Sequence, residues 1–551
     1  MDNSKKHRIA ILVKNLEQKN FNGELIQNLL ENEDIILDTI IINSHQENLD
    51  KIFNVFKKYS LKRIFEKILF NFVSFFENLF SVLLKKNLNF TNTDLRNLKV
   101  KRIYVKPEID FFKNIFRYSD EDIKKIRDRN LDLIIRLESG ILKGEILKSA
   151  KKGIISFHHG DNKFYRGLPP GFWEVYNNDS STGFVVQKLN EKLDDGEIIF
   201  KGNTITQPYY ILNQQFVYKQ SIKYFNKILN NYLKDGNSKF LISDENKSKI
   251  FKEPNLKELF LYVRKTYFFI FKKILMRSLG YKEIWNICFK REKFKKENLK
   301  DYKIINNPQK RFFADPFVIS YQNTNYIFVE DYDLLKKKGQ ISCIQVMENK
   351  DKFIGQVLNE DFHLSFPYIF KFKENFFMCP ETKEKNEIRI YKCNKFPVQW
   401  SYFKTLIKNI NAVDTVIFEK NNIWWLLTNT DKNNLEFSSE LSIYYSINGP
   451  LTENWVTHKK NPIIVDANKA RNAGLIFDGK NHFRLNQKIG FNNYGTGFEI
   501  NIIDEINDRD YKETLCEIVS SELLKGYKGT HHLSSIDSFS VIDLKKFSNK
   551  Y

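Results

Sequence analysis

The feature that most limits the fold of this chain is a repeat in its C-terminal half. Four short segments rich in aromatic and β-branched residues align from Asp315, Phe366, Asp414 and Ala473, so their starts are 51, 48 and 59 residues apart. A polar turn and then a second strand with aromatic residues follow each segment. A period near 50 residues with several short strands per unit is typical of propeller blades. We therefore expect an all-β propeller over about residues 283–551.

The repeat also places acidic residues at equivalent positions. Asp315 and Asp414 each begin an innermost strand, and Glu330 and Glu381 lie 15 residues after the starts of successive units. We expect Asp315, Glu381 and Asp414 to meet in one axial pocket. Such acids can hydrolyse a glycosidic bond, bind sugar hydroxyls or close the blades structurally, and sugar binding is favoured over hydrolysis. Further candidates for this channel are Arg484, Gln487, His531 and His532.

Strands and helices alternate in the first 235 residues. Apolar runs typical of buried strands lie at 9–13, 35–42, 103–105, 131–135 and 153–157, with helical patterns between several of them. This order predicts an α/β domain with a doubly wound, Rossmann-like parallel sheet. The motif Gly-x-Gly-x-x-Gly does not follow the first strand, so the sequence does not support a dinucleotide cofactor.

One segment of this half, residues 156–196, has the composition of a catalytic loop. A buried strand ends in Ser156-Phe157-His158, and the segment returns on a predicted hairpin. Three further motifs follow in order, namely Arg166-Gly167-Leu168-Pro169-Pro170, Thr182-Gly183 and Leu193-Asp194-Asp195-Gly196. His158 and Asp194 are 36 residues apart.

This segment resembles the signature of the 10-formyltetrahydrofolate-dependent formyltransferases, which include methionyl-tRNA, glycinamide ribonucleotide and sugar formyltransferases. In that family a strand ends in Asn-x-His, and Arg-Gly-x-x-Pro, Thr-Gly and Leu-Asp-x-Gly follow. Four motifs in one order at the family's spacing make a specific match. The resemblance implies 10-formyltetrahydrofolate as formyl donor, His158 as hydrogen-bond donor and proton shuttle, and Asp194 as the residue that orients it.

The match has one departure, because Ser156 stands where the family has Asn. A hydroxyl is a single and shorter donor than an amide, so Ser156 must substitute as a catalytic residue, or His159 or Asn162 must contribute, or the enzyme is slow. The resemblance implies a cofactor site made by Leu137, Glu138, Gly140, Leu142, Leu193 and Asp195. It implies a substrate site made by His159, Asp161, Asn162 and Arg166. An inherited pair in an inactive fold is the alternative.

The C-terminal half resembles a second family over about residues 285–551. Its motifs Phe312-Phe313-Ala314-Asp315-Pro316 and Pro380-Glu381 are similar to those of five-bladed propellers in the glycoside hydrolase 43-like superfamily. They are most similar to the N-terminal type fused in glucosamine inositolphosphorylceramide transferases. The resemblance implies a five-bladed β-propeller that binds glycans or acts as a glycosidase.

Two apolar stretches, residues 61–85 and 256–276, contain too many charged residues for a membrane-spanning helix. We expect amphipathic helices packed against the protein, and the alternative is that their apolar faces rest on a membrane surface. The second stretch lies in a helical linker predicted at 236–282. The linker would join a formyltransferase-like domain at 1–235 to the propeller at 283–551.

Charge and cysteine content limit the partners. The formal net charge is +21, which favours phosphorylated or anionic-lipid partners. Basic residues do not alternate with aromatic residues as in an RNA groove, so we expect no nucleic-acid partner. Five cysteines without metal-ligand spacing predict reduced thiols and no metal site. The expected location is the cytoplasm, with the inner face of the membrane as an alternative.

These features predict a formyltransferase, a one-carbon transferase that moves a formyl group from 10-formyltetrahydrofolate to an amine. The expected acceptor is an amino sugar, on a sugar nucleotide or a lipid-linked glycan, in surface-polysaccharide or glycolipid biosynthesis. One alternative is a glycan-binding or scaffold protein with a vestigial formyltransferase fold. Another is a methionyl-tRNA formyltransferase, which is disfavoured because the usual C-terminal partner in that family is a small RNA-binding barrel. The sequence leaves the oligomeric state open.

Overall fold

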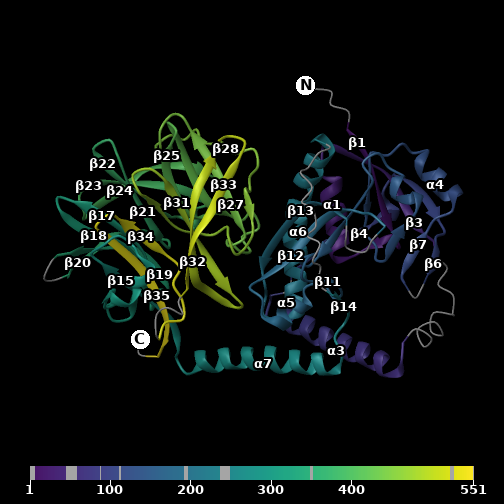
Figure 1. The fold of residues 1–551 in the computed structure, drawn as a ribbon, viewed down its shortest axis with the longest axis horizontal. Coiled ribbons are helices and arrows are strands. Elements are labelled where there is room, and N and C mark those ends of the chain that lie inside the picture. The colour runs from purple at the N-terminus through teal and green to yellow at the C-terminus, as the bar shows by residue number, and fades with distance from the viewer. Residues whose placement is uncertain are drawn as a thin grey trace. The chain divides into compact units, whose positions relative to one another are not determined.

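The computed structural model describes residues 6–44, 59–86, 88–110, 113–191, 196–235, 249–347, 351–520 and 526–549. The chain divides into two compact units, Met1–Ile270 and Phe271–Tyr551. Figure 1 shows that the first unit mixes helices with a sheet, whereas the second is built from strands. The division falls inside helix α7 (Leu256–Ser278).

The first unit is organised by a seven-stranded sheet with the order β13-β12-β10-β8-β1-β3-β5. The five strands from β10 to β5 run parallel, and β12 and β13 form an antiparallel hairpin that pairs with β10. The strands are β1 (His7–Val13), β3 (Ile35–Asn43), β5 (Lys101–Val105), β8 (Leu133–Arg136), β10 (Ile154–His159), β12 (Ser181–Lys188) and β13 (Glu197–Ile205). Because β1 lies between β3 and β8, the order reverses there, and ligands bind at such switch points in open α/β sheets.

Helices cover both faces of this sheet. Five consecutive residues of β1, from Ile9 to Val13, are fully buried, which requires cover on both sides because neighbouring side chains in a strand point to opposite faces. Helix α4 (Asp120–Arg127) packs Ile123 and Ile126 into one core cluster with Ala10 and Leu12. Helices α1 (Asn20–Leu30) and α6 (Tyr210–Asp235) contact each other, and α6 also contacts β12 and β13. The predicted α/β class of the first half is confirmed.

Shorter elements complete the first unit. They are β2 (Glu17–Gln18), β4 (Thr93–Asp94), β6 (Glu108–Asp110), β7 (Ile115–Arg117), β9 (Ile141–Lys143), β11 (Arg166–Gly167), β14 (Ile250–Phe251) and the helices α3 (Leu61–Leu83) and α5 (Phe172–Asn177), with single 3-10 turns at Leu95–Asn97 and Glu145–Lys148. Within the described ranges, no helix is long and apolar enough to cross a bilayer.

Helix α3 packs its polar side against the protein. Its buried side chains are Glu66, Phe70, Glu77 and Ser81. Nine exposed apolar side chains lie on the other side, at Leu61, Phe65, Ile68, Phe72, Phe75, Phe76, Leu79, Val82 and Leu83. At 3.6 residues per turn these nine positions fall within an arc of about 120°, and we call this arc the outer face of α3. The expectation that the apolar side packs against the protein is wrong for this helix, because its polar side chains find partners inside.

Those partners come from α6, α7 and the turn before α7. The Glu77 carboxylate accepts hydrogen bonds from the hydroxyls of Tyr262 and Tyr267 and from the backbone N–H of Ile211 at 2.9 Å. Arg63 donates to Glu66 at 2.9 Å and to the Glu253 carboxylate at 3.1 Å. Buried charged groups are tolerated when they are paired in this way.

The second unit consists, over its described residues, of five separate antiparallel sheets. Four are contiguous in sequence, namely β17-β18-β19-β20, β21-β22-β23-β24, β25-β26-β27-β28 with β29 on β27, and β30-β31-β32-β33. The fifth, β16-β15-β35-β34, combines the first and last strands of the unit through nine residue pairs between β15 and β35. One end strand of each sheet contacts the end strand of the next sheet, in the order β17, β21, β25, β30, β34 and back to β17. The prediction of a strand-rich C-terminal half is confirmed.

The bounds of these strands follow the repeat. In the first two sheets they are β17 (Arg311–Tyr321), β18 (Thr324–Asp333), β19 (Lys338–Val346), β20 (Asp351–Leu358), β21 (Ser365–Phe372), β22 (Asn375–Glu381), β23 (Glu387–Lys395) and β24 (Gln399–Lys408). In the next two they are β25 (Ala412–Lys420), β26 (Ile423–Thr430), β27 (Glu440–Ser446), β28 (Val456–Thr457), β29 (Ile464–Val465), β30 (Asn472–Phe477), β31 (His482–Gly490), β32 (Asn493–Ile506) and β33 (Tyr511–Ser520). The fifth has β15 (Lys282–Lys290), β16 (Lys303–Ile305), β34 (Leu533–Ile536) and β35 (Phe539–Ser548), and 3-10 turns lie at Lys296–Asp301 and Lys383–Lys385.

Each repeat begins with the same irregularity. The ladder shifts register near the repeat start in β17, β21, β25 and β30. Asp315, Phe366 and Asp414 have φ angles of 48°, 46° and 52°, in the left-handed region that residues other than glycine seldom adopt. A bulge of this kind redirects a side chain and is common beside functional sites. The left-handed turn thus brings Asp315 and Asp414 into equivalent positions in their sheets.

We expect Glu77→Gln to change how the first unit responds to pH. Burial raises the pKa of Glu77 to about 7 even though Tyr262 and Ile211 stabilise its charged form. The unfolded chain therefore loses this proton first, and stability falls as pH rises from about 4.5 to about 7, by about 3 kcal/mol in total. The melting temperature of Glu77→Gln relative to the native protein should be higher at about pH 8 than at about pH 5.

The control for this measurement is Glu66→Gln on the same helix face. Arg63 overcomes the effect of burial and holds the pKa of Glu66 below its ordinary value. The stability that Glu66 contributes is therefore lost only as pH falls below about 4.5, so its substitution should shift the melting temperature equally across the same window. Equal behaviour of the two variants would contradict the assignment for Glu77.

Candidate functional sites

The candidate catalytic residues of the first unit lie on one face of β10. Alternation along the strand places Ser156 and His158 together and Phe157 with His159 on the opposite face. His158 is buried, and its Nε2 lies 3.0 Å from the backbone oxygen of Tyr165. The Ser156 hydroxyl donates to the backbone oxygen of Phe157 at 3.3 Å. The other predicted members of this site, Leu193, Asp194 and Asp195, lie outside the described residues.

Gly160 allows the chain to fold back over His158. Its φ is 149°, and a Cβ there would lie 2.6 Å from the Tyr165 oxygen and 3.2 Å from His158 Nε2. Any side chain at this position would therefore push away the carbonyl that meets the imidazole. Glycine is needed here because of this close approach.

His159 belongs to the core and not to the face that carries His158. Its ring lies 4.7 Å from Phe21 of α1 and 4.5 Å from Tyr218 of α6, between ring centres, and its Nε2 is 3.0 Å from the Ser221 hydroxyl. Burial lowers the pKa of His159 to about 3, so the ring is neutral. The structure thus separates His159 from the predicted substrate-binding residues, because one step along a strand reverses the side of the sheet.

The remaining predicted substrate residues follow β10 in the loop. Asp161 forms an ion pair with Lys201 at 2.8 Å and accepts a hydrogen bond from the backbone N–H of Lys163 at 2.8 Å. Asn162 is buried, and Arg166 begins β11, which pairs with β14. A cavity of about 240 Å³ lies beyond this loop and is lined by Lys67, Phe70, Asn71, Leu168, Pro169, Pro170 and Glu253.

Helix α5 carries a buried acid near this loop. Glu174 is almost completely buried, and burial raises its pKa to about 8, so it is largely protonated at neutral pH. Neighbouring Tyr165 donates its hydroxyl hydrogen bond to Asp179. The backbone carbonyl that faces His158 therefore belongs to a residue whose own side chain is anchored.

The predicted cofactor residues lie at the C-terminal ends of the parallel strands. Asn43, the last residue of β3, donates to Glu138 at 2.5 Å and accepts from the Tyr118 hydroxyl at 3.0 Å. Arg136, the last residue of β8, donates to the backbone oxygen of Gly140 and pairs in register with Ser156. Burial raises the pKa of Glu138 even though Arg136 lies nearby. This polar network connects the Leu137–Gly140 turn to the strand that carries His158.

Three predicted residues at this edge have structural roles. A Cβ at Gly140 would lie 2.3 Å from the ring of Phe116, and its φ is 106°, so only glycine fits. Leu142 is buried in the core cluster on the α4 side of the sheet. The backbone oxygen of Leu137 accepts from Asn22 at 2.8 Å.

Sequence reasoning missed Asn43, Tyr118 and Arg136 at this edge. A signal was present for two of them, because Asn43 and Arg136 are polar residues that end apolar parallel strands. Ligands of open α/β sheets bind outside these strand ends. Tyr118 reaches Asn43 from outside the sheet, and only the fold reveals that contact.

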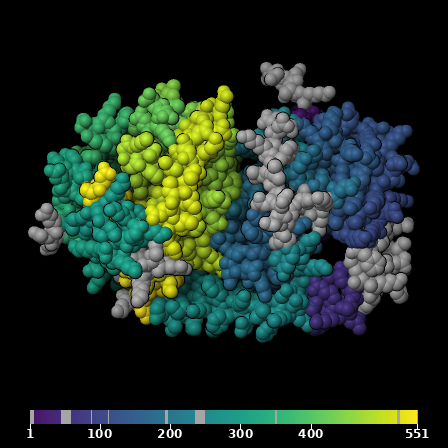
Figure 2. All heavy atoms as spheres, viewed as in Figure 1, coloured from purple at the N-terminus to yellow at the C-terminus, as the bar shows by residue number. Residues whose placement is uncertain are grey.

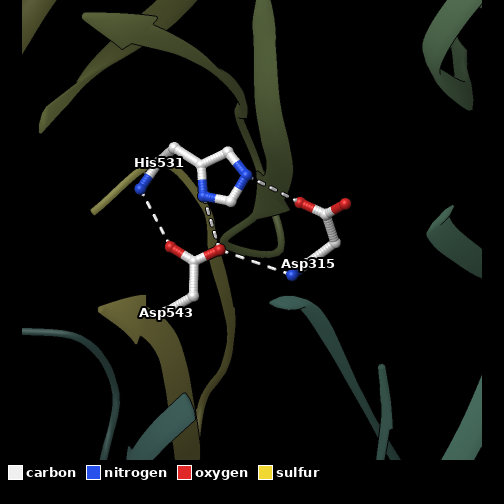
Figure 3. A group of neighbouring side chains, drawn as sticks. All are labelled: Asp315, His531 and Asp543. Carbon is white, nitrogen blue, oxygen red and sulfur yellow. Dashed lines mark hydrogen bonds and ion pairs between the residues drawn. The ribbon is translucent and has the colours of Figure 1, made fainter. Parts of the chain in front are cut away.

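The acidic residues of the second unit gather around His531. As Figure 3 shows, the imidazole lies between two carboxylates, with Nε2 3.2 Å from Asp315 and Nδ1 2.6 Å from Asp543. Burial alone would lower the pKa of His531, but Asp543 and Asp315 outweigh burial and raise it to about 10. Asp543 also accepts from the backbone N–H groups of His531 and His532 at 2.8 and 3.1 Å. The result is a buried carboxylate–imidazolium–carboxylate bridge.

The ligand atoms of Asp315, His531 and Asp543 lie within 4.8 Å of one another, which is close enough for a metal ion. A metal would need an unprotonated ring nitrogen, and both nitrogens of His531 face carboxylates that favour the protonated form. The geometry therefore fits the ionic bridge better than a metal site.

The predicted acids of the repeat join this bridge. Asp414 accepts from Arg471 Nε at 2.7 Å and from Gln487 at 3.4 Å. Burial, together with the charge of Asp414, raises the pKa of Glu381 to about 8. Burial and Asp315 likewise raise the pKa of Glu330, whereas His531 overcomes burial and lowers the pKa of Asp315. The pKa values of neighbouring acids in this group are thus shifted in opposite directions, which is how acid and base roles become separated.

Arg484 was predicted to belong to this group, but the structure places it elsewhere. It binds the Glu513 carboxylate through Nε at 2.7 Å and the backbone oxygens of Lys469 and Ala470. Its long side chain therefore fixes the start of the fourth repeat. The guanidinium beside the acids is that of Arg471, which also lies over the ring of Tyr494 with a separation of 5.0 Å.

Two members of this group were missed from the sequence. Arg471 lies two residues before the start of the fourth repeat at Ala473, so its position beside the repeat was a usable signal. Asp543 lies in β35, outside the aligned segments, and nothing in the sequence marks it. The fold brings it beside Asp315 because β35 pairs with β15.

Comparison with known proteins finds two kinds of relative. Residues 302–545 match the family model described as glucosamine inositolphosphorylceramide transferase 1, N-terminal. The chain is 32% identical over 222 residues to glucosamine inositolphosphorylceramide transferase 1 of Oryza sativa subsp. japonica, covering 39% of this chain and 29% of that protein. It is 33% identical over 103 residues to methionyl-tRNA formyltransferase of Clostridioides difficile (strain 630), covering 18% of this chain and 33% of that protein. The chain thus spans a third or less of the length of these curated relatives.

Solved structures similar to this chain include a sugar N-formyltransferase from Shewanella sp FDAARGOS_354, with 14% identity, a TM-score of 0.28 and coverage of 47% of this chain and 87% of that one. Glycinamide ribonucleotide transformylase 1 from Symbiobacterium toebii gives 11% identity, a TM-score of 0.28 and coverage of 45% and 95%. The similarity to known families therefore rests on the sequence matches. The chain combines a formyltransferase-like region with a region similar to the N-terminal part of glucosamine inositolphosphorylceramide transferases, as predicted.

We expect Asp543→Asn to lower the pKa of His531 by about one unit or more, because one of its two anionic neighbours becomes neutral. In the native protein, the stability contributed by the raised pKa is complete below about pH 6.5 and is lost as pH rises through about 10. Histidine NMR signals recorded against pH measure the shift. Asp537→Asn, at a highly exposed side chain of the same unit, is the control. An unchanged His531 titration would contradict the ionic bridge.

Proposed function

We propose that the first unit transfers a formyl group from 10-formyltetrahydrofolate to an amine. The observation that supports this most directly is the position of His158, buried on the same face as Ser156 beside the C-terminal strand ends. Ligands bind at such edges in open α/β sheets. The match to methionyl-tRNA formyltransferases supports the reaction class.

The residues at the strand ends fit a folate. Asn43, Arg136 and Glu138 offer hydrogen-bond donors and acceptors, and Gly140 lets the turn between them pack closely against Phe116. Bound there, the folate would supply the activated formyl group. The residues Leu137–Gly140 would form its wall, together with Leu193 and Asp195, whereas Leu142 could contribute only backbone because its side chain packs in the core.

The proposed role of His158 is to donate a hydrogen bond to the formyl oxygen, where negative charge develops as the amine adds to the formyl carbon. The new carbon–nitrogen bond forms while the bond to the folate nitrogen breaks, and the amine proton passes to that nitrogen. Asp194 would orient His158 and help to move the proton. Ser156, on the same face, would supply a second donor. Asp161, Asn162 and Arg166 would position the acceptor.

We expect His158→Ala and Asp194→Asn each to reduce formyl transfer by about 10² to 10⁴, the range for a general acid–base group. Ser156→Asn should keep or increase the rate, because an amide is the stronger donor. The assay follows product from 10-formyltetrahydrofolate with amino-sugar nucleotides and, separately, with methionyl-tRNA. Calorimetric titration with 5-formyltetrahydrofolate, a stable analogue, controls for lost binding.

The outcomes of this assay separate the alternatives. Absence of folate binding at millimolar concentration would contradict the enzymatic function and favour a vestigial domain. Transfer to methionyl-tRNA but to no amino sugar would contradict the proposed acceptor. A large loss in Ser156→Asn would show that the hydroxyl has a dedicated role.

We further propose that the five sheets are the blades of a five-bladed propeller and that it holds the glycan acceptor. The cyclic contacts of β17, β21, β25, β30 and β34 support this arrangement. Its acids, Asp315, Glu381 and Asp414, suit a sugar with several hydroxyls and an amine. An amine-bearing sugar is also the nucleophile that the first unit requires. In this proposal residues 1–235 are catalytic, 236–282 link the domains and 283–551 bind glycan.

We expect Glu381→Ala to abolish binding of amino-sugar glycans on an array, because it removes one of the proposed sugar-binding side chains. Asp315→Ala should have the same effect, but it also breaks the bridge to His531, so its melting temperature must be measured alongside. Asp537→Ala is the matched control. Release of reducing sugar by the native protein would make the unit a hydrolase. If the native protein neither binds glycans nor releases sugar, the proposed glycan site is contradicted.

A further inference from the structure

The outer face of α3 exposes apolar side chains that a folded surface helix ordinarily hides. The exposed fractions of Phe65, Phe72 and Phe75 are 56%, 57% and 62%. The outer face of α3 extends from the first residue of the helix, Leu61, to the last, Leu83. Contiguous exposed apolar surfaces of this kind mark interaction sites.

Helix α7 adds to this surface within the first unit. The hydrogen bonds from Tyr262 and Tyr267 to Glu77, and from the Leu256 N–H to Glu66 at 3.4 Å, hold its first half beside α3. Phe260 and Phe268 in this half of α7 are also exposed, with exposed fractions of 68% and 66%. Figure 2 shows α3 in purple and α7 in teal on the visible surface of the molecule.

The charges around this surface have one sign. Within residues 61–86 and 256–270, no aspartate or glutamate side chain is exposed, because Glu66 and Glu77 are buried and Glu258 is partly covered. The exposed charged side chains of these two ranges are all basic, namely Lys62, Lys85, Lys86, Lys257, Arg264 and Lys265. The whole chain carries a net charge of +21.

We propose that the outer face of α3, together with the first half of α7, binds the surface of an anionic lipid bilayer. Aromatic and aliphatic side chains would enter the boundary between headgroups and acyl chains, and the lysines would pair with anionic headgroups. Amphipathic helices lie in this plane when apolar residues form one face and lysine or arginine residues border it. A bilayer explains the basic border, which a purely apolar partner would not.

The orientation of α3 supports this partner. The hydrogen bonds of Glu77 and Arg63 hold the polar side of α3 against the protein, so the apolar side faces outward. Because the contacts are specific, the helix presents this face before any partner binds. No conformational change is therefore needed for docking, and binding is independent of the proposed formyl transfer.

The test is sedimentation of the full-length protein with phosphatidylcholine vesicles, alone or mixed with phosphatidylglycerol, without a formyl donor. We expect binding to the mixed vesicles that weakens with added salt. Phe72→Gln combined with Phe75→Gln should reduce the partition coefficient at least about tenfold. The matched control changes two exposed phenylalanines of the second unit, Phe477→Gln with Phe547→Gln, and should bind like the native protein.

Charge is tested in the same assay. Lys85→Glu with Lys86→Glu should lose binding to the anionic vesicles, whereas Lys352→Glu with Lys373→Glu, at exposed positions in the second unit, should largely retain it. Equal loss in both pairs would show a net-charge effect and overturn the proposal. So would absent vesicle binding by the native protein, or a dimer in sedimentation velocity that the Phe72 and Phe75 changes dissociate, since the partner would then be a second copy of this chain.

Discussion

The pairing of β15 with β35 is the contact on which the second unit depends. It joins the first strand of the unit to the last through nine residue pairs, so the fifth sheet exists only when both ends of the unit meet. Asp543 lies in β35 opposite Ile287 of β15 and reaches His531 and the backbone of Asp315 from there. The ionic group at the start of the repeats is therefore assembled by the same ladder that joins the two ends.

Buried charge is used in both units, and in both it is paired. In the second unit, His531 lies between two carboxylates and Arg471 lies against Asp414. Removing one member of such a pair leaves an uncompensated charge in a low-dielectric interior, which costs about 3–5 kcal/mol. Replacing a pair by apolar residues is often neutral for stability, so stability alone does not explain why these groups are present. Their position at the left-handed repeat starts is consistent with a role in binding.

The first unit shows how polar contacts can orient a helix. The buried side chains of α3 include two glutamates, and each is satisfied by donors from neighbouring segments. A rotation of the helix that buried the phenylalanines would expose these carboxylates but would also break the bonds to Arg63, the Ile211 N–H and the tyrosines. The directionality of hydrogen bonds thus fixes the face that hydrophobic burial alone would have reversed.

The sequence by itself determined the parts of this protein that depend on local order. The alternation of apolar runs and helical patterns predicted the α/β half, the 50-residue period predicted the strand-rich half, and the motifs predicted the two similarities to known families. The repeat also predicted that Asp315, Glu381 and Asp414 meet in one axial pocket, which stays a prediction. The two fold classes could be predicted because periodicity and spacing are written along the chain.

The tertiary structure alone decided which side chains meet across distant segments. It packed His159 between α1 and α6 and brought Asp543 to His531. It also placed Arg471 beside Asp414, where Arg484 had been expected. It also determined that the apolar face of α3 is exposed. An amphipathic pattern gives a helix two faces, but it does not show which of them packs against the rest of the protein. The physical reason is the same in each case, because burial and charge pairing depend on neighbours that lie far away in the sequence.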